Sequence, residues 1–101
     1  MSKNIPEDLK DYRQQIDAID QELITLLARR YEIVRAVGAL KARENLSVIQ
    51  HERAEHVKQK ACELASQKGL SPDLVRKIYE TMIDYAHELE HEIIENTHRQ
   101  A

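Results

Sequence analysis

The sequence has little of what tight turns are made of. Its 101 residues include only two glycines and two prolines, and phenylalanine and tryptophan are absent. Because Gly and Pro supply most tight turns, this scarcity argues against a sheet of many short strands and favours a few long helices. We therefore expect an all-α fold, with residues 1–101 forming a single domain.

Basic charge and cysteine are also scarce. A formal net charge of −3 argues against a general nucleic-acid binder, since such domains carry a basic excess. The single Cys62 has no partner for an internal disulfide, and the opening MSKNIPEDLK lacks the apolar core of a secretion signal. We expect a protein of the reducing cytoplasm, with neither nucleic acid nor membrane as a partner.

A heptad seam of ten positions runs along the first forty residues. Nine of the ten side chains suit a buried seam, but the seventh position is an arginine. A guanidinium is almost never left in an apolar seam without an anionic partner, so Arg30 either fixes the register of the helices or marks an internal anion site. The ten positions are Leu9, Tyr12, Ile16, Ile19, Leu23, Leu26, Arg30, Ile33, Val37 and Leu40.

The seam predicts one long helix from Pro6 or Glu7 through Ala42, about 50 Å in length. Such a rod would protrude from a compact monomer of this size, so we expect a homodimer with this helix in its interface.

Two shorter patterns predict a second and a third helix. Ser47 and Gln50 have the spacing of a capping box that opens the second helix, which stops at Gly69. Its apolar face carries Ala54, Val57, Ala61 and Leu64. Ser71 is the expected N-cap of the third helix and Pro72 its first residue. The apolar positions of that helix are Val75, Ile78, Tyr79, Met82, Ile83, Ala86, Leu89 and Ile93.

Several charged residues fall on or beside these apolar faces. On an ideal helix Arg30 and Lys41 point within about 20° of each other, whereas Arg13 points about 100° away and suits the site of a partner in an antiparallel dimer. Glu90 joins an apolar stripe of the third helix, so we expect it to be partly buried. It either pairs with a cation or, when protonated, serves as a hydrogen-bond donor.

Two further features have a structural and a functional reading. Gly38 lies between Arg30 and Lys41, where it either keeps the wall of a pocket open or allows helices to pack closely. His87-Glu88-Leu89-Glu90-His91 has the H-E-x-x-H form of zinc proteases. Ile94 and Thr97 stand where the longer signature has glycine and histidine, so we expect exposed histidines and no metal site.

The chain resembles the all-helical chorismate mutase family from about Leu9 to Ile94. The most specific segments are YRQQIDAIDQELITLLARRYEIVRAVGALKA, HERAEHV and LVRKIYETMIDYAHELE. The resemblance implies three-helix subunits intertwined as a homodimer, a small dicarboxylate substrate, no cofactor, and conversion of chorismate to prephenate.

The resemblance also implies roles for individual residues. Arg30, Lys41 and Arg53 would bind the substrate from one subunit and Arg13 from the other, with Lys41 directed at the ether oxygen. Glu90 would donate a hydrogen bond to the same oxygen and must be protonated to do so. Gln50 and Ala86 stand where other members read the substrate hydroxyl, and Ala54 replaces a glutamate there.

Three alternatives stay open on the sequence alone. Isochorismate pyruvate lyases share the fold and similar cations, although the glutamate at position 90 and the length of the connection after the first helix favour the mutase. The atypical Gln50 and Ala54 allow a mutase of 4-amino-4-deoxychorismate. A non-catalytic helical dimer would keep the heptads without needing the four cations and Glu90 together.

Overall fold

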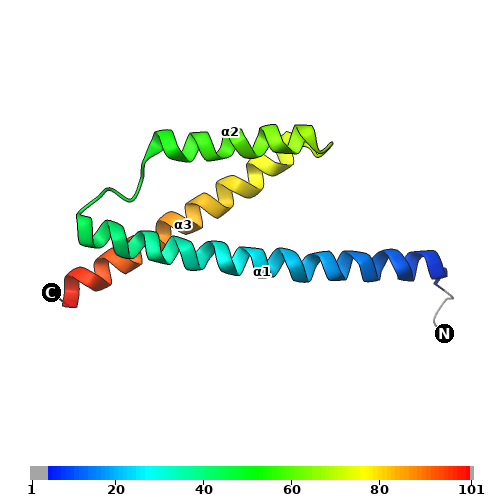
Figure 1. Cartoon of the computed structure of the whole chain (residues 1–101), viewed down its shortest axis with the longest axis horizontal. Helices are drawn as coiled ribbons and strands as arrows, with labels where there is room; N and C mark the ends of the chain where they lie inside the picture. Colours follow the sequence, from blue (N-terminus) through cyan, green and yellow to red (C-terminus); the bar gives the residue numbers. More distant parts are fainter. Residues whose placement is uncertain (1–4, 101) are drawn as a thin grey trace. The chain divides into compact units, whose positions relative to one another are not determined.

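A computed structural model describes residues 5–100, and within this range the chain is helical with no strand. Helix α1 spans Glu7–Glu44, α2 spans His51–Gln67 and α3 spans Pro72–Gln100 (Figure 1). The all-α fold with a long first helix is confirmed, and α1 ends two residues beyond the predicted Ala42. None of the described helices is long and apolar enough to cross a membrane.

The chain divides after Glu32 into two compact units, and the division falls inside α1. The first unit is the helical segment up to Glu32, in which no described residue is fully buried. Its apolar seam side chains are open to solvent, from 39% exposed at Leu9 to 63% at Tyr12. This stripe therefore has no cover within its own unit.

The second unit comprises residues 33–44 of α1 together with α2 and α3. Helices α2 and α3 form an antiparallel hairpin, in which Ala61 and Ala65 of α2 are buried with Val75 of α3 (Figure 1). Tyr79 is partly buried against this cluster. The predicted apolar face of α2 is confirmed at Ala61, whereas Leu64 is 46% exposed.

The turn between α2 and α3 closes as the sequence predicts. Gly69 has a φ of 72°, the left-handed conformation that favours glycine after a helix. The amide of Leu70 donates to the Ala65 carbonyl at 2.8 Å and that of Gly69 to Ser66 at 3.2 Å, the two bonds of a Schellman motif. Ser71 caps α3, because its hydroxyl accepts the Leu74 amide at 3.3 Å.

The predicted start of α2 is wrong. Ser47 and Gln50 do not form a capping box: α2 begins at His51, and Gln50 is its N-cap residue without a side-chain cap. The Gln50 side chain instead donates to the Ser47 carbonyl at 3.4 Å. Val48 is buried at 6% exposure, and its carbonyl accepts a hydrogen bond from Lys41, which keeps this connection out of the helix.

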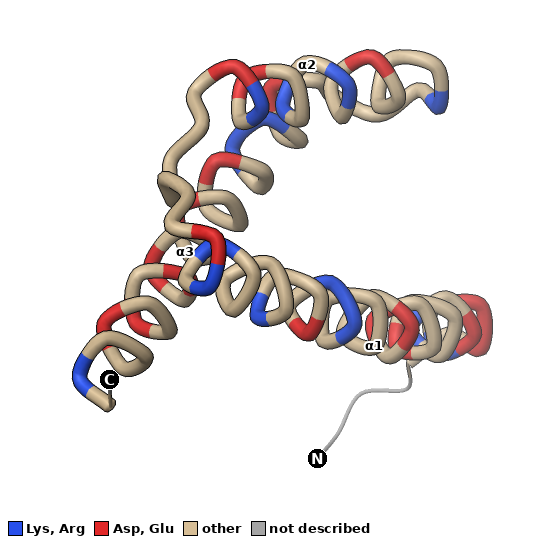
Figure 2. Tube along the Cα trace, turned by 60° about the vertical axis from the view of Figure 1, so that its left-hand side comes forward, with Lys and Arg blue, Asp and Glu red and all other residues tan. Residues whose placement is uncertain are grey.

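Charged residues are distributed along all three helices. Figure 2 shows both acidic and basic positions on every helix. They are not evenly mixed, because α3 carries only acidic charges from Glu80 to Glu95. This distribution fits the small net charge of −3. Any positively charged site in the described residues must therefore be a local arrangement of a few side chains.

Candidate active site

A buried ion pair joins α1 to α3 in the second unit. The Lys41 ammonium lies 2.6 Å from Oε1 of Glu90, and their side chains are only 13% and 6% exposed. The same ammonium donates to the Val48 carbonyl at 2.8 Å. Of the two readings of Glu90, its pairing with a cation is thus observed, and the cation is Lys41.

Helix packing explains why this pair can be buried. A Cβ on Gly38 would lie 3.3 Å from the Cα of Glu90 and 3.1 Å from Cδ1 of Ile93. Only glycine lets the backbone of α1 approach α3 this closely without displacing it. Of the two readings of Gly38, close helix packing is the one observed.

The ammonium of Lys41 is oriented by its two partners. A lysine ammonium has three N–H donors, and Lys41 gives one of them to the Val48 carbonyl while its charge is paired with Glu90. Val48 takes only one of the three donors, so the ammonium can still donate to a ligand. A cation held in a largely buried setting stabilises negative charge on a bound oxygen more strongly than one in water.

Three other residues named from the sequence lie in the second unit. Ala86 is buried on α3, one turn before Glu90. Gln50 and Arg53 are exposed at the start of α2, where they line an open cavity with His51 and Glu52. Arg53 also lines a second cavity with apolar side chains of α2 and Tyr79 of α3.

Two of the predicted site residues lie in the first unit. Arg13 is exposed on α1, and Arg30 is partly buried with its guanidinium 6.0 Å from the centre of the Tyr31 ring. The alignment of Arg30 with Lys41 and the reach of Arg13 into a second subunit stay predictions.

The histidine motif gives no metal site in the part of the chain that the structure describes. His91 is exposed on α3 while His87 is partly buried. Across residues 5–100, no group of three or more His, Cys, Asp or Glu side chains could hold a metal ion.

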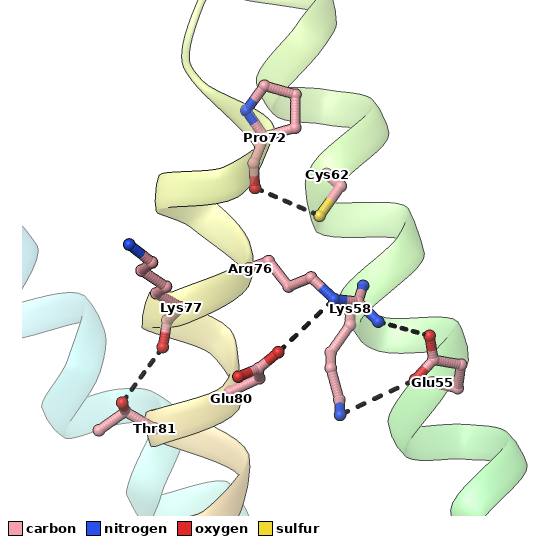
Figure 3. A network of polar contacts seen from close by, with 8 residues as sticks. All are labelled: Glu55, Lys58, Cys62, Pro72, Arg76, Lys77, Glu80 and Thr81. Carbon is pink, nitrogen blue, oxygen red and sulfur yellow. Dashed lines mark hydrogen bonds and ion pairs between the residues drawn. The ribbon is translucent and has the colours of Figure 1, made fainter.

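Sequence reasoning missed two polar features of the second unit. The Val48 carbonyl is a backbone group in the connection between α1 and α2, and no pattern of side chains predicts its contact with Lys41. Glu55 of α2 and Arg76 of α3 form a hydrogen-bonded ion pair at 2.7 Å (Figure 3). They are 21 residues apart, and each reads as an ordinary surface charge until the hairpin brings them together.

Known proteins resemble this chain over most of its length. The profile of the family described as chorismate mutase type II matches residues 12–91. A T-protein of Haemophilus influenzae is 39% identical over 72 residues, which are 71% of this chain and 19% of that protein. A chorismate mutase of Methanocaldococcus jannaschii is 23% identical over 91 residues, 90% of this chain and 92% of that protein.

A 4-amino-4-deoxychorismate mutase of Streptomyces pristinaespiralis is 29% identical over 82 residues, which are 81% of this chain and 64% of that protein. The chain spans about a fifth of the length of the T-proteins that it matches.

Proposed function

Since the chain belongs to the chorismate mutase type II family, we propose that it is an isomerase that rearranges chorismate to prephenate without a cofactor. The observation that carries this proposal is the buried 2.6 Å contact between Lys41 and Glu90. It supports a site that presents a positive charge and a hydrogen-bonding group side by side to one atom of a substrate.

The reaction is a pericyclic rearrangement, in which the ether C–O bond lengthens while a new C–C bond forms within one molecule. The protein has to hold the compact conformer and stabilise the negative charge that grows on the ether oxygen. Lys41 offers an N–H to that oxygen. Glu90, when protonated, donates a second hydrogen bond to the same oxygen.

Arginines bind the two carboxylates of the substrate in this proposal. Arg30 and Arg53 of one subunit and Arg13 of its partner have the planar donor geometry that grips a carboxylate bidentately. The exposed positions of Arg13 and Arg53 are compatible with binding a ligand. Gln50 and Ala86 complete the substrate-binding set near the ring hydroxyl.

We infer that residues 1–101 act as one domain of an intertwined homodimer. The support is the solvent-exposed stripe of the first unit, where Ile16, Ile19 and Leu23 are 51–61% exposed. Burying apolar side chains contributes about 1.5–3 kcal/mol each, so a second copy that covers this stripe gains substantial stability. The free thiol of Cys62 further supports our inference that the protein works in the reducing cytoplasm.

Product identification tests the proposed reaction. The purified protein is incubated separately with chorismate, isochorismate and 4-amino-4-deoxychorismate, and the products are separated by chromatography. We expect prephenate from chorismate. Salicylate from isochorismate, or turnover of the amino analogue alone, would replace the proposal with the corresponding alternative, and three unchanged substrates would indicate a non-catalytic helical dimer.

A pair of variants links the activity to the site. Lys41→Ala should lower kcat with chorismate about 100- to 1000-fold, the loss typical of removing one group that stabilises a developing oxyanion. Lys77→Ala is the matched control, because this lysine is exposed on α3. Equal activity of the two variants would exclude Lys41 from the chemistry.

A further inference from the structure

A network of polar side chains connects α2 to α3, whereas the pair of Lys41 and Glu90 connects α1 to α3. Nη2 of Arg76 donates to Oε1 of Glu55 at 2.7 Å, and Nε of Arg76 lies 3.5 Å from Glu80 one turn along α3 (Figure 3). Lys58 approaches the other oxygen of Glu55 at 3.8 Å. Arg76 therefore contacts Glu80 on its own helix and, at the same time, Glu55 on the neighbouring helix.

The apolar part of the hairpin does little to fix how far α2 is shifted along α3. The buried residues of α2 are two alanines, Ala61 and Ala65, and both lie in its second half. Alanine gives a helix surface only shallow ridges, so the interlocking of side chains that normally sets helix position is weak here. The first half of α2, which carries Arg53, has no fully buried side chain.

The contact between Arg76 and Glu55 supplies the directional restraint that the alanines lack. Glu55 lies in the first half of α2, only two residues after Arg53. The hydrogen bond from Arg76 keeps the pKa of Glu55 below its usual value, and Glu55 in turn raises the pKa of Arg76. A lowered folded-state pKa means that this stabilisation is present above the unfolded pKa of Glu55 and is lost as the pH falls through the folded one.

We propose that Arg76 and Glu55 are positioning residues, which fix the axial position of α2 on α3 and thereby the place where Arg53 meets the substrate. The part about Arg53 rests on the proposed function. Cutting the contact leaves a folded hairpin in which α2 shifts or tilts, so that Arg53 reaches the substrate carboxylate less often.

The experiment uses Glu55→Ala and measures two quantities. This variant removes the contact but leaves Arg76 in place next to Cys62, whose thiol donates to the Pro72 carbonyl at 3.5 Å. Cys62 is the only cysteine in the chain, so its rate of reaction with a thiol reagent reports on the separation of α2 and α3 without any substrate. The second measurement determines KM and kcat for chorismate separately, to show which of the two changes.

We expect Glu55→Ala to react several-fold faster at Cys62. We also expect its KM to rise by up to about tenfold, less than the roughly 100-fold loss that a 1 Å misplacement can cause, while kcat changes little. The swapped pair Glu55→Arg with Arg76→Glu should restore KM towards wild type, since it rebuilds the contact in reverse. Its Cys62 reactivity is not compared, because Arg76 no longer lies beside the thiol. Glu95→Ala, at an exposed acid of α3 far along the chain from Cys62, is the control and should change neither.

Each other outcome decides a different part of the proposal. Unchanged Cys62 reactivity in a folded Glu55→Ala protein would overturn the restraint itself. Faster reaction with an unchanged KM, or a swapped pair that restores nothing, would overturn the positioning of Arg53. If the wild-type protein converts no substrate, the proposed function fails with the part about Arg53, and Cys62 reactivity still decides whether the contact holds α2.

Discussion

At the scale of single residues, contacts with Glu90 and the Val48 carbonyl hold Lys41 in a defined orientation. Helical spacing on α3 predicted that Glu90 would be partly buried, and its burial goes further, to 5% exposed. The identity of its partner was beyond sequence reasoning, because Lys41 and Glu90 belong to helices far apart in the chain. The contact is also the reverse of the proposed catalytic one, since Glu90 pairs with the Lys41 cation here and has to donate a hydrogen bond to the substrate.

This reversal predicts a pH dependence. Only a protonated Glu90 can donate in the proposed reaction, so kcat/KM of the wild-type protein should fall as the pH rises. Glu90→Gln carries a neutral donor at every pH, and its profile should be nearly flat. Steady-state rates between about pH 5 and about pH 8 measure the difference.

Two controls isolate Glu90 from its charged neighbours. Lys41 faces it from α1, and His87 lies one turn earlier on α3 and belongs to the residue type that changes charge near neutral pH. His87→Gln should leave the alkaline fall in place, as should Glu88→Gln at an exposed site. A wild-type profile that is flat over this range would remove the donor role from Glu90.

At the scale of the elements, the sequence correctly predicted those helix ends that are determined by a few neighbouring residues. Gly69, Ser71 and Pro72 fix the turn between α2 and α3 through backbone conformation and a side-chain cap, which a sequence window contains. The prediction of where α2 starts failed because a tertiary contact determines the conformation of the residues before it. The Lys41 ammonium binds the Val48 carbonyl, and a capping pattern read over four residues holds no information about a lysine seven positions away.

The close approach of α1 to α3 predicts the effect of Gly38→Ala. The substitution gains about 1 kcal/mol of helix propensity, but the new methyl group presses on the backbone of Glu90 at 3.3 Å. Overpacking of this kind costs about 1–3 kcal/mol, so we expect a lower melting temperature and a weaker Lys41–Glu90 contact. Thermal unfolding and kcat with chorismate measure the two effects.

Gly69→Ala is the control for the effect of Gly38→Ala on kcat. An added Cβ at Gly69 meets nothing within 4 Å, but the φ of 72° strains any other residue there. It should therefore lower stability while leaving kcat nearly unchanged. If the Gly38→Ala protein keeps its full kcat, α3 can move away from the added methyl group at Glu90 without any loss of activity.

At the scale of the whole molecule, the heptad pattern predicted a seam, and the structure leaves that seam open to solvent. The stripe of the first unit, from Leu9 to Leu26, is 39–63% exposed. A sequence shows that such a face exists, because period and side-chain type are local properties. What covers the face depends on a surface elsewhere, which periodicity does not specify.

Subunit mixing tests whether the partner's Arg13 completes each site. Arg13→Ala and Arg30→Ala dimers should each be nearly inactive. After exchange, a mixed dimer of two-fold symmetry has one site with both arginines, so about a quarter of all sites should recover at equal mixing. The regained rate of prephenate formation measures the recovery.

Subunit exchange has to be followed independently, for example with one variant carrying an affinity tag. Complete exchange with no regained activity would place Arg13 and Arg30 in the site of the same subunit.

The short turn at Gly69 also determines the order of events during folding. Ala65 and Val75 are near neighbours in sequence as well as in the core of the hairpin, so their contact requires little loop-closure entropy. The α2–α3 hairpin can therefore close early and at a rate independent of protein concentration. Burial of the open stripe on α1 by a second copy is a bimolecular step, and newly made chains would complete it only after they meet.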